Sequence, residues 1–208
     1  MILGLVKRHL AVKILLLLLP LLIGSLAFFS WFLIQSRIQI IEDNNFQKAR
    51  TAALVGSQAM EYALEELVNG GFLTRAEVFD RNYIPLNEGP LAGSIIPKYT
   101  TAYDRFLDTR IRHIEDAFQS DPSIVFAVLV DGNGYLPTHN SNYSLPLTGD
   151  EVKDRVGNRT KRIFADPVGL NAARYEGIDG QGVLRQIYHR DTGVTMWAVA
   201  APVRVFGE

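Results

Sequence analysis

The sequence predicts an α+β fold, in which an N-terminal transmembrane helix and a long helix precede an antiparallel sheet with helices on one side. Three observations support this prediction. Residues 14–34 contain no charged side chain, and residues 37–69 place apolar side chains at steps of three and four. After residue 123 the pattern changes to β-branched and apolar runs that are bounded by glycine-containing turns. The helical part of the chain therefore comes first and the sheet follows it.

The uncharged run Ile14–Ile34 is long enough to cross a membrane. As a helix it extends about 30 Å, which matches the hydrocarbon core of a bilayer. Three basic residues precede it, namely Lys7, Arg8 and Lys13. Because positive charge favours the cytoplasmic side, we expect residues 1–13 in the cytoplasm and residues 35–208 outside it.

The same run differs from a cleaved signal peptide, whose apolar region is usually only about 7–15 residues long and ends at a pair of small residues. Here the run is longer and ends in aromatic side chains, which are typical of a membrane interface: Phe28, Phe29, Trp31 and Phe32. We therefore interpret it as an uncleaved anchor.

Composition excludes several classes of protein. The formal net charge is −1, which gives no indication of nucleic-acid binding. The chain has no cysteine, which excludes disulfides, thiolate metal ligands and covalently attached c-type haem. No nucleophile elbow, zinc-binding His-Glu-x-x-His sequence or paired-carboxylate motif is present. We therefore expect no catalytic residue, no metal site and no enzymatic activity.

Residues 37–69 are predicted to form a helix that leaves the membrane. Its apolar positions include Ile41, Ala49, Ala52, Ala59, Ala63 and Leu67, and no proline interrupts them. Asn69-Gly70-Gly71 is a strong stop signal, because glycine readily adopts the left-handed conformation that ends a helix. The helix either covers a domain core or acts as a stalk that carries a displacement across the membrane, and the sequence favours neither.

Two further helices are predicted. Thr74 and Glu77 fit a capping box that opens a short helix at residues 75–79. Residues 83–98 contain three prolines and two glycines and are predicted to be a loop. A second amphipathic helix begins at residues 101–104 and ends at Asp121-Pro122.

Four strands are predicted in the second half of the chain. They are residues 124–130, 135–138, 183–190 and 194–205. The first two are joined by a tight turn at residues 131–134, and the last two by a turn at residues 191–193. Residues 148–164 are polar and are predicted to contain short helices. Pro202 indicates that the last strand is interrupted or lies at an edge.

The order of several short sequences resembles the periplasmic sensor region of bacterial methyl-accepting chemotaxis proteins, of the Cache-like type with a PAS-related sheet. The resemblance extends from about Ile40 to the end of the chain. The most specific segments are Asp131-Gly132-Asn133-Gly134-Tyr135-Leu136-Pro137-Thr138-His139-Asn140 and Asn158-Arg159-Thr160-Lys161-Arg162-Ile163-Phe164. Weaker ones are Phe79-Asp80, Pro97-Lys98-Tyr99, Val125-Phe126-Ala127 and Tyr188-His189-Arg190-Asp191-Thr192-Gly193.

The resemblance implies a sensor that binds a small molecule between the sheet and its covering loops and signals across the bilayer as a homodimer. It implies a bacterial inner-membrane protein with a single span and a periplasmic domain at residues 35–208. A PAS-like sheet has five strands, and its last strand is central. This sequence supplies four, so we expect a sheet that lacks its last strand and a chain that forms the front part of a receptor.

The basic residues of the specific segment 158–164 are the first candidates for ligand binding. Arg159, Lys161 and Arg162 lie close together in the sequence, and guanidinium groups form bidentate pairs with carboxylates. The alternative is a solvated loop or helix end.

The ends of the predicted strands supply further candidates. On a strand, Tyr188 and Arg190 share one face while His189 takes the other, so the first two are candidates to line a pocket. His139 follows the second strand. His139 and His189 are also candidates for binding non-covalent haem, whereas some relatives attach haem covalently through Cys-x-x-Cys-His. The alternative role for both histidines is ordinary hydrogen bonding at the strand ends, and we favour it.

Other functions share these features. The same fold serves as the input domain of sensor histidine kinases and of cyclic-dinucleotide enzymes. A haem-based gas sensor and an anchored interaction module without a ligand also remain open.

Overall fold

The computed structural model describes residues 10–177, 180, 182–190 and 193–208. The chain divides into two units, residues 1–45 and residues 46–208. Two predicted features lie partly outside the described residues: residues 1–9 of the expected cytoplasmic segment 1–13, and Asp191 and Thr192 of the turn between the last two predicted strands.

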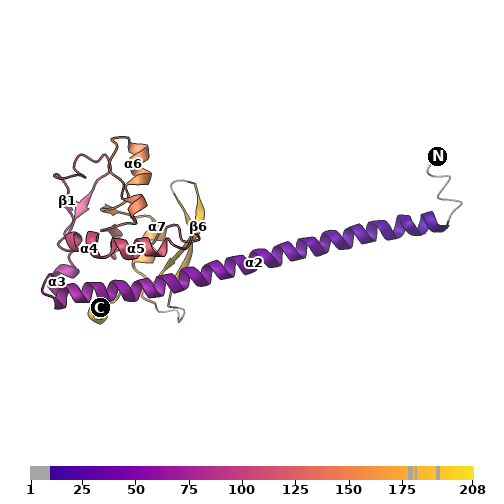
Figure 1. Ribbon diagram of the computed structural model, residues 1–208, viewed down its shortest axis with the longest axis horizontal. Helices are drawn as coiled ribbons and strands as arrows, with labels where there is room; N and C mark the ends of the chain where they lie inside the picture. Colours follow the sequence, from indigo (N-terminus) through magenta and orange to yellow (C-terminus); the bar gives the residue numbers. More distant parts are fainter. Residues whose placement is uncertain (1–9, 178–179, 181, 191–192) are drawn as a thin grey trace. The chain divides into compact units, whose positions relative to one another are not determined.

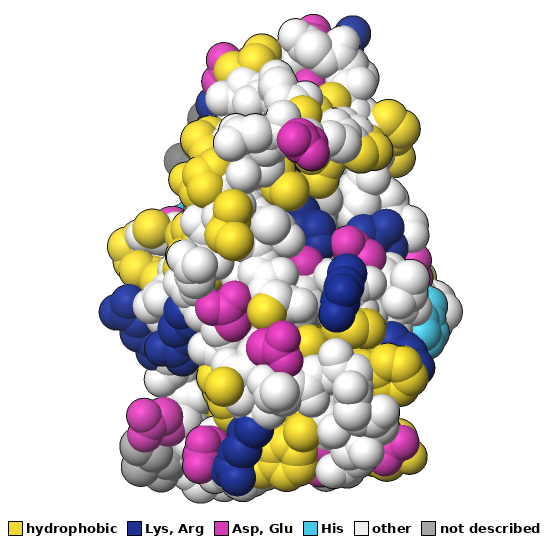
Figure 2. Space-filling model, turned by 90° about the vertical axis from the view of Figure 1, so that its left-hand side faces the viewer, with side chains coloured by type: hydrophobic (Ala, Val, Ile, Leu, Met, Phe, Trp, Pro, Cys, Tyr) yellow, Lys and Arg dark blue, Asp and Glu magenta, His cyan; other side chains and the backbone are white. Residues whose placement is uncertain are grey.

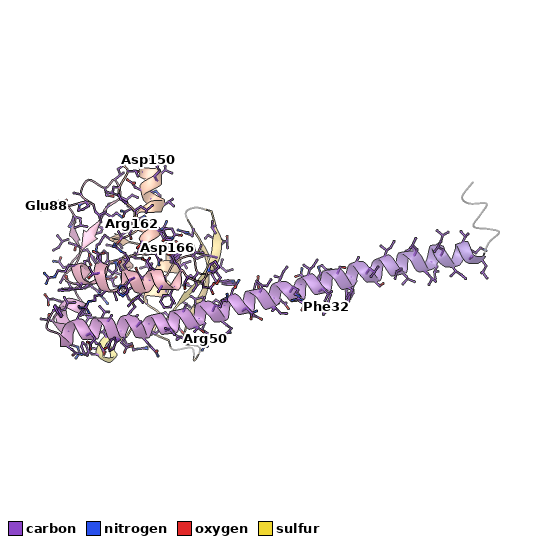
Figure 3. The ribbon with its side chains drawn as sticks, viewed as in Figure 1. Phe32, Arg50, Glu88, Asp150, Arg162 and Asp166 are labelled. Carbon is purple, nitrogen blue, oxygen red and sulfur yellow. The ribbon has the colours of Figure 1, made fainter. Side chains whose placement is uncertain are left out.

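Helix α2, Leu10–Asn69, is a single α-helix of 60 residues that includes Pro20 (Figure 1). The helices predicted at residues 14–34 and 37–69 are confirmed and are continuous. By length and composition this helix could cross a membrane, and its most apolar stretch is fully exposed. Figure 3 shows the side chain of Phe32 on this uncovered stretch of α2, and Phe32 is 55% exposed. Exposed apolar side chains are unfavourable in water and favourable in lipid, so this surface is compatible with a membrane.

Helix α2 ends where the glycines predict. Gly71 has a φ of 71°, and the amides of Phe72 and Leu73 donate to the carbonyl oxygen of Leu67 over 2.9 and 3.1 Å. Helix α3, Arg75–Val78, follows immediately. Its capping box is confirmed. The side chain of Thr74 accepts a hydrogen bond from the amide of Glu77, and the side chain of Glu77 accepts one from the amide of Thr74.

Helices α4, Asp104–Arg110, and α5, Arg112–Phe118, correspond to the second predicted helix, with Ile111 between them. They lie alongside the C-terminal part of α2 (Figure 1). The core of the second unit is formed by apolar side chains from these helices and from neighbouring segments. Its members are Met60, Leu64, Leu67, Leu73, Val78, Tyr103, Leu107, Ile111, Tyr135 and Val205. The buried face of α2 therefore positions the rest of the second unit.

Within the described residues, six strands pair into three antiparallel two-stranded sheets. The pairs are β1 (Ile84–Pro85) with β2 (Tyr99–Thr100), β3 (Tyr135–Leu136) with β4 (Arg162–Ile163), and β5 (Leu184–His189) with β6 (Thr195–Ala200). The β5–β6 hairpin confirms the last two predicted strands, and β6 ends before Pro202. The fold is therefore mixed, with helices and small antiparallel sheets.

The strand predicted at residues 124–130 is wrong: the structure describes all seven residues and assigns none of them to a strand. Two backbone amides of this segment are bound by side chains instead of by a neighbouring strand. The amide of Ala127 donates to Asn140 Oδ1 over 3.0 Å, and that of Leu129 donates to Glu115 Oε1 over 3.1 Å. The run is mostly half-buried, but it does not form part of a ladder.

The predicted hairpin of residues 124–130 with 135–138 is wrong for the same reason. Strand β3 is shorter than predicted and pairs with β4, where Leu136 lies opposite Arg162. The tight turn is present, because the amide of Gly134 donates to the carbonyl oxygen of Asp131 over 2.8 Å. Gly134 has a φ of 83°, and a Cβ at this position would lie 2.2 Å from the carbonyl oxygen of Phe164. Only glycine allows that approach.

Helices α6, Glu151–Gly157, and α7, Pro167–Ala173, follow the turn Ser141–Tyr143, a 3-10 helix. Asp150 and Asp166, labelled in Figure 3, are their N-caps and accept hydrogen bonds from amides of the first turn. Helix α6 falls in the segment predicted to contain short helices, and α7 was not predicted. Val168 of α7 accepts a hydrogen bond from Gln186 of β5 over 3.1 Å, which ties α7 to the hairpin. A last 3-10 turn is formed by Val205–Gly207.

Candidate functional site

The basic segment that the sequence singles out is buried. Its first five residues, Asn158, Arg159, Thr160, Lys161 and Arg162, are each at most 9% exposed. On the molecular face in Figure 2, by contrast, acidic and basic side chains are interspersed at the surface. Burying charged and polar groups is costly unless each finds a partner. The partners of this segment therefore determine what it does.

Lys98 holds the backbone at the start of this segment. Its Nζ donates to the carbonyl oxygen and to Oδ1 of Asn158 over 2.8 and 2.6 Å, and to the carbonyl oxygen of Thr160 over 2.7 Å. Burial lowers the pKa of Lys98 to about 7, with a further lowering from the nearby charge of Arg162. Lys98 appears in the sequence resemblance but was not predicted as a site residue. Its three acceptors indicate a structural role.

Lys161 is directed to helix α4. Its Nζ lies 3.2 Å from Asp104 Oδ2 and 2.8 Å from Asp108 Oδ2. Asp104 also accepts hydrogen bonds from Thr101 Oγ1, over 2.7 Å, and from the hydroxyl of Tyr135. Burial, together with the negative charge of Asp104, raises the pKa of Tyr135. The charge of Lys161 is thus neutralised inside the protein.

The backbone of Lys161 is also unusual, with a φ of 60°, a region that a residue with a side chain rarely adopts. Two backbone hydrogen bonds hold it there. Its amide donates to the carbonyl oxygen of Leu136 over 2.8 Å, and its carbonyl oxygen accepts from the amide of Tyr99 over 2.9 Å. A strained conformation of this kind persists only where the surroundings determine it, which here are β2, β3 and α4.

His139 lies in a second group, which contains aromatic side chains and an arginine. Its ring centroid is 4.8 Å from that of Tyr143 and 5.8 Å from that of Phe126, and the residue is 3% exposed. Burial lowers the pKa of His139 to about 3, and the charges of Arg159 and Arg190 lower it further. The imidazole is therefore neutral at physiological pH. Its Nδ1 has no hydrogen-bond partner among the described residues.

Arg190 covers the two aromatic rings beside His139. Its guanidinium carbon is 5.1 Å from the ring centroid of Tyr143 and 5.7 Å from that of Phe126, as in cation–π pairs. Its Nη1 donates to the hydroxyl of Tyr143 over 3.3 Å. The buried Nε has no partner in the part of the chain that the structure describes. We refer to Phe126, His139, Tyr143 and Arg190 as the aromatic–arginine cluster.

Further buried polar atoms lie on residues next to this cluster. Asn140 is 0% exposed, and its Nδ2 atom lacks a partner among the described residues. Glu115 of α5 is also 0% exposed, and burial raises its pKa to about 8. Its Oε1 accepts from the amide of Leu129, and a side-chain hydrogen bond with Thr138 partly offsets the rise in its pKa.

The predicted site residues lie in two different places, one near Phe164 and His139 and the other beside helix α4. Arg159 and Arg162 place their guanidinium carbons 5.3 and 4.6 Å from the ring centroid of Phe164, and the charge of Arg159 also acts on His139. Arg162, labelled in Figure 3, donates to the carbonyl oxygen of Arg155 over 3.1 Å. Lys161 faces the acidic side chains of α4 instead.

The two remaining candidates lie on strand β5. Tyr188 is half-buried opposite Met196 of β6. His189 is exposed, and its Nδ1 is 2.9 Å from Thr195 Oγ1, which is the ordinary hydrogen bonding expected at a strand end. The structure therefore brings His139, Arg159 and Arg190 together but not His189 or Lys161.

Sequence reasoning missed Phe126, Tyr143 and Glu115 as parts of the site. Phe126 lay in a run that was interpreted as a strand, and Tyr143 lay in a polar stretch that no ligand-binding motif marked. Glu115 occupies a position in an amphipathic helix where an acidic side chain is expected to be solvated. Only their tertiary contacts identify them.

The residues that the structure describes contain no group of three or more acidic or histidine side chains that could hold a metal ion. The polar atoms of the aromatic–arginine cluster are mainly nitrogen atoms of arginine and histidine. Such a set is suited to contacts with the oxygen atoms of a small molecule.

No protein-family model matches the chain, and no curated protein and no solved structure shows a significant match to it.

Proposed function

We propose that the chain is the membrane-anchored, extracytoplasmic sensor region of a bacterial chemotaxis receptor, and that it binds a small molecule at the aromatic–arginine cluster. In this proposal residues 14–34 cross the inner membrane, and residues 35–208 form a periplasmic domain related to Cache and PAS domains. The chain transmits a signal and has no catalytic role. The proposal rests on the sequence resemblance and on two features of the structure.

The first feature is the continuity of helix α2, and it is the observation that carries the proposal. One helix contains the uncharged run Ile14–Ile34 and also four residues that are buried in the second unit. These residues are Gly56, Met60, Leu64 and Leu67. A rearrangement of the core around these residues therefore acts on the helix that, in this proposal, continues into the membrane. A ligand shifts such an equilibrium when it binds one arrangement more tightly than the other.

The second feature is the set of buried polar atoms without partners near His139. Most buried polar groups in proteins have a hydrogen-bond partner, and each group that lacks one costs about 1–3 kcal/mol. The described residues place several of them together, on His139, Asn140 and Arg190. A small molecule that supplies their partners would recover this energy. The candidates Arg159 and Arg162 belong to the same charged surroundings, and Tyr188 lies two residues before Arg190 on the chain.

A chemical screen tests ligand binding. The full chain is placed in lipid nanodiscs, and its melting temperature is measured with amino acids, organic acids and amines. A ligand at 100 times its dissociation constant stabilises the folded state by about 2.7 kcal/mol. We expect at least one compound to raise the melting temperature and the variant Arg190→Gln to abolish that rise. If none of the compounds raises it, the sensor proposal is wrong.

Membrane orientation is tested separately. The chain contains no cysteine, so single cysteines can be introduced without removing any. Thr51→Cys, on an exposed position of α2, is expected to react with a membrane-impermeant maleimide in intact spheroplasts. Lys13→Cys is the matched control, and it is expected to react only after lysis. Equal labelling of both before lysis would contradict the proposed orientation.

The homodimer is also part of the proposal. A nitroxide attached at Gln58→Cys, on an exposed position of α2, would report the distance between two copies in detergent micelles. We expect a defined inter-label distance in the full chain. If no inter-label distance is detected at any protein concentration, the chain is a monomer.

The non-covalent haem alternative has little support from the two histidines. An axial ligand must present a ring nitrogen to the face of a porphyrin, whereas His139 is 3% exposed and lies beside two aromatic rings. His189 is already within hydrogen-bond distance of Thr195. We therefore do not extend the proposal to haem. A Soret band in the chain reconstituted with haem, lost in His139→Gln, would favour the alternative instead.

A further inference from the structure

The turn Ser141–Tyr143 joins the aromatic–arginine cluster to helix α5. Its last residue, Tyr143, belongs to the cluster, where its ring centroid is 4.8 Å from that of His139 and its hydroxyl accepts from Arg190. Its first residue, Ser141, is bound to α5. The amide of Ser141 donates to Asp116 Oδ1 over 2.7 Å, and its Oγ donates to Asp116 Oδ2 over 2.6 Å. One carboxylate of α5 therefore holds the start of the turn that places an aromatic ring at the site.

Asp116 supplies a cap that this short turn lacks locally. A 3-10 turn of three residues has little stability of its own, because fixing its backbone gains few hydrogen bonds. Within the described chain, the residue before the turn, Asn140, makes no side-chain hydrogen bond that caps it. The Oδ1 of Asn140 instead accepts from the amide of Ala127 over 3.0 Å. The first amide of the turn is thus bound by a helix that is distant in the sequence.

The other side of the turn is bound to the buried basic segment. The carbonyl oxygen of Tyr143 accepts from the amide of Arg159 over 2.7 Å, and Ser144 forms an antiparallel bridge with Asn158. The turn is therefore held from two sides. A shift of its Tyr143 end changes the distance between Ser141 and Asp116 unless α5 moves as well.

Helix α5 also contacts helix α2, two residues after Asp116. A Cβ at Gly56 of α2 would lie 3.3 Å from Cε2 and Cζ of the Phe118 ring, and Figure 1 shows α5 alongside α2. Glycine inside a helix is less favourable than alanine, and the close approach of this ring accounts for a glycine at this buried position. Lys48 of α2 and Asp121, just after α5, add an ion pair of 3.0 Å.

We propose that helix α5 couples the aromatic–arginine cluster to helix α2, with Asp116 as the residue that positions Tyr143 and Phe118 as the contact with α2. This inference rests on the proposed function, because it names the element through which occupancy of the site acts on α2. It holds whichever ligand binds. A ligand that favours one position of Tyr143 favours the matching position of α5, and the contact of Phe118 with Gly56 extends that preference to α2.

Hydrogen exchange of the full chain in nanodiscs, measured by mass spectrometry, tests this coupling without a ligand. The exchange rate of the α2 amides at residues 52–60 reports how often the helix opens around Gly56. Tyr143→Leu removes the ring and hydroxyl contacts of the cluster. We expect it to raise this rate at least about threefold, which is an ordinary size for coupling through packed side chains. In a chain that also carries Asp116→Ala, Tyr143→Leu is expected to raise it less than about 1.5-fold.

Two variants separate a positioning role from general support of the fold. Asp116→Asn keeps an oxygen that accepts from the Ser141 amide and gains an amide group that donates to Ser141 Oγ. We expect it to retain at least about half of the response to Tyr143→Leu. Asp150 offers a matched control, because it also accepts from two donors, at the start of the short helix α6. Asp150→Ala is expected to leave the response at residues 52–60 unchanged.

Three outcomes overturn the inference. If Tyr143→Leu raises the exchange rate equally with and without Asp116→Ala, the coupling does not pass through Asp116. If Tyr143→Leu leaves residues 52–60 unchanged, the cluster is not coupled to α2 through α5. If Asp116→Ala raises exchange by the same factor in α6 as in α2, Asp116 supports the whole fold and does not position Tyr143. The proposed function fails by a different result, when none of the screened compounds raises the melting temperature.

Discussion

Replacing Lys161 by methionine tests whether this residue is a buried structural partner or a ligand-binding group. The exposed fraction of the Lys161 side chain is 8%, and that of Asp104 is 3%. Lys161→Met keeps most of the length of the side chain and removes its charge, so the carboxylate of Asp104 is left buried without a cation. Removing one member of a buried ion pair typically costs about 3–5 kcal/mol.

The structure places the expected loss at the lower end of this range. Asp104 retains hydrogen bonds from Thr101 and Tyr135, each of which contributes about 1 kcal/mol. Asp108 is 34% exposed at its side chain, so the second ion pair of Lys161 is partly screened and contributes at most about 1 kcal/mol. We therefore expect Lys161→Met to lower the free energy of unfolding by about 3 kcal/mol.

Urea denaturation of the full chain in detergent measures this loss. The chain has two tryptophans, so Trp31→Phe in every variant leaves the fluorescence of Trp197 as the reporter. With a dependence of about 2 kcal/mol per molar urea, the midpoint should fall by about 1.5 M. Lys153→Met is the control, because Lys153 is 73% exposed and its ion pair of 3.8 Å with Asp150 contributes less than about 0.5 kcal/mol.

A second variant removes the alternative explanation that methionine simply packs poorly. Asp104→Asn combined with Lys161→Met eliminates both charges, and we expect it to recover more than half of the lost stability. If Lys161→Met is as stable as Lys153→Met, the buried pair does not stabilise the fold and the structural role assigned to Lys161 is refuted. If Lys161→Met loses ligand binding and keeps its stability, Lys161 is instead a ligand-binding residue.

Three further predictions concern the same domain. Gly134→Ala should lower the free energy of unfolding by more than about 2 kcal/mol, because its Cβ would lie 2.2 Å from the carbonyl oxygen of Phe164. Gly149→Ala, at a φ of 79° with no atom within 4 Å, should cost only about 1 kcal/mol in the same urea titration. For Glu115, burial raises the pKa from 4.5 to about 8, so the folded state binds the proton more tightly than the unfolded state. Stability should therefore fall as pH rises from about 4.5 to about 8, and melting curves of Glu115→Gln should lack this fall. Leu67→Ala, at a side chain that is 1% exposed, should cost about 2–5 kcal/mol by chemical denaturation, and a loss below 1 kcal/mol would contradict its place in the core.

The helical part of the fold was predictable because its signals are local. The glycines after Asn69 and the capping box of Thr74 and Glu77 each act within one or two turns of the chain. The hairpin of β5 and β6 has the same property, since its strands are separated by a short turn. Such features depend on neighbours in the sequence, and the sequence shows those neighbours directly.

The pairing of strand β3 was not predictable in this way. Tyr135 pairs with Ile163, which is far along the chain, and the nearer segment 124–130 is bound by the side chains of Asn140 and Glu115. A buried apolar run is equally compatible with a ladder and with side-chain capping of its amides. The choice between them depends on contacts that no local pattern encodes.

The candidate site was predictable only by residue type. Arg159 was identified as an anion-binding candidate, Arg190 as a pocket-lining residue and His139 as a candidate haem ligand, and the structure places the three near one another. The rings of Phe126 and Tyr143, which fix the geometry of Arg190, were not identified. An aromatic side chain in a sequence is most often part of a core, and its partner determines whether it does more.

The two sides of the buried basic segment differ in a way that bears on function. On the side of α4, the ammonium of Lys161 has two carboxylates as partners, so the fold alone accounts for its burial. Near His139, several buried polar atoms lack partners among the described residues. Stability alone does not favour such a set, because each atom without a partner costs about 1–3 kcal/mol, and apolar side chains of the same shape would avoid this cost. The cost is expected where a group is kept ready for a partner from outside the chain. Of the two sides, the one around His139 and Arg190 is therefore the one to test for a ligand.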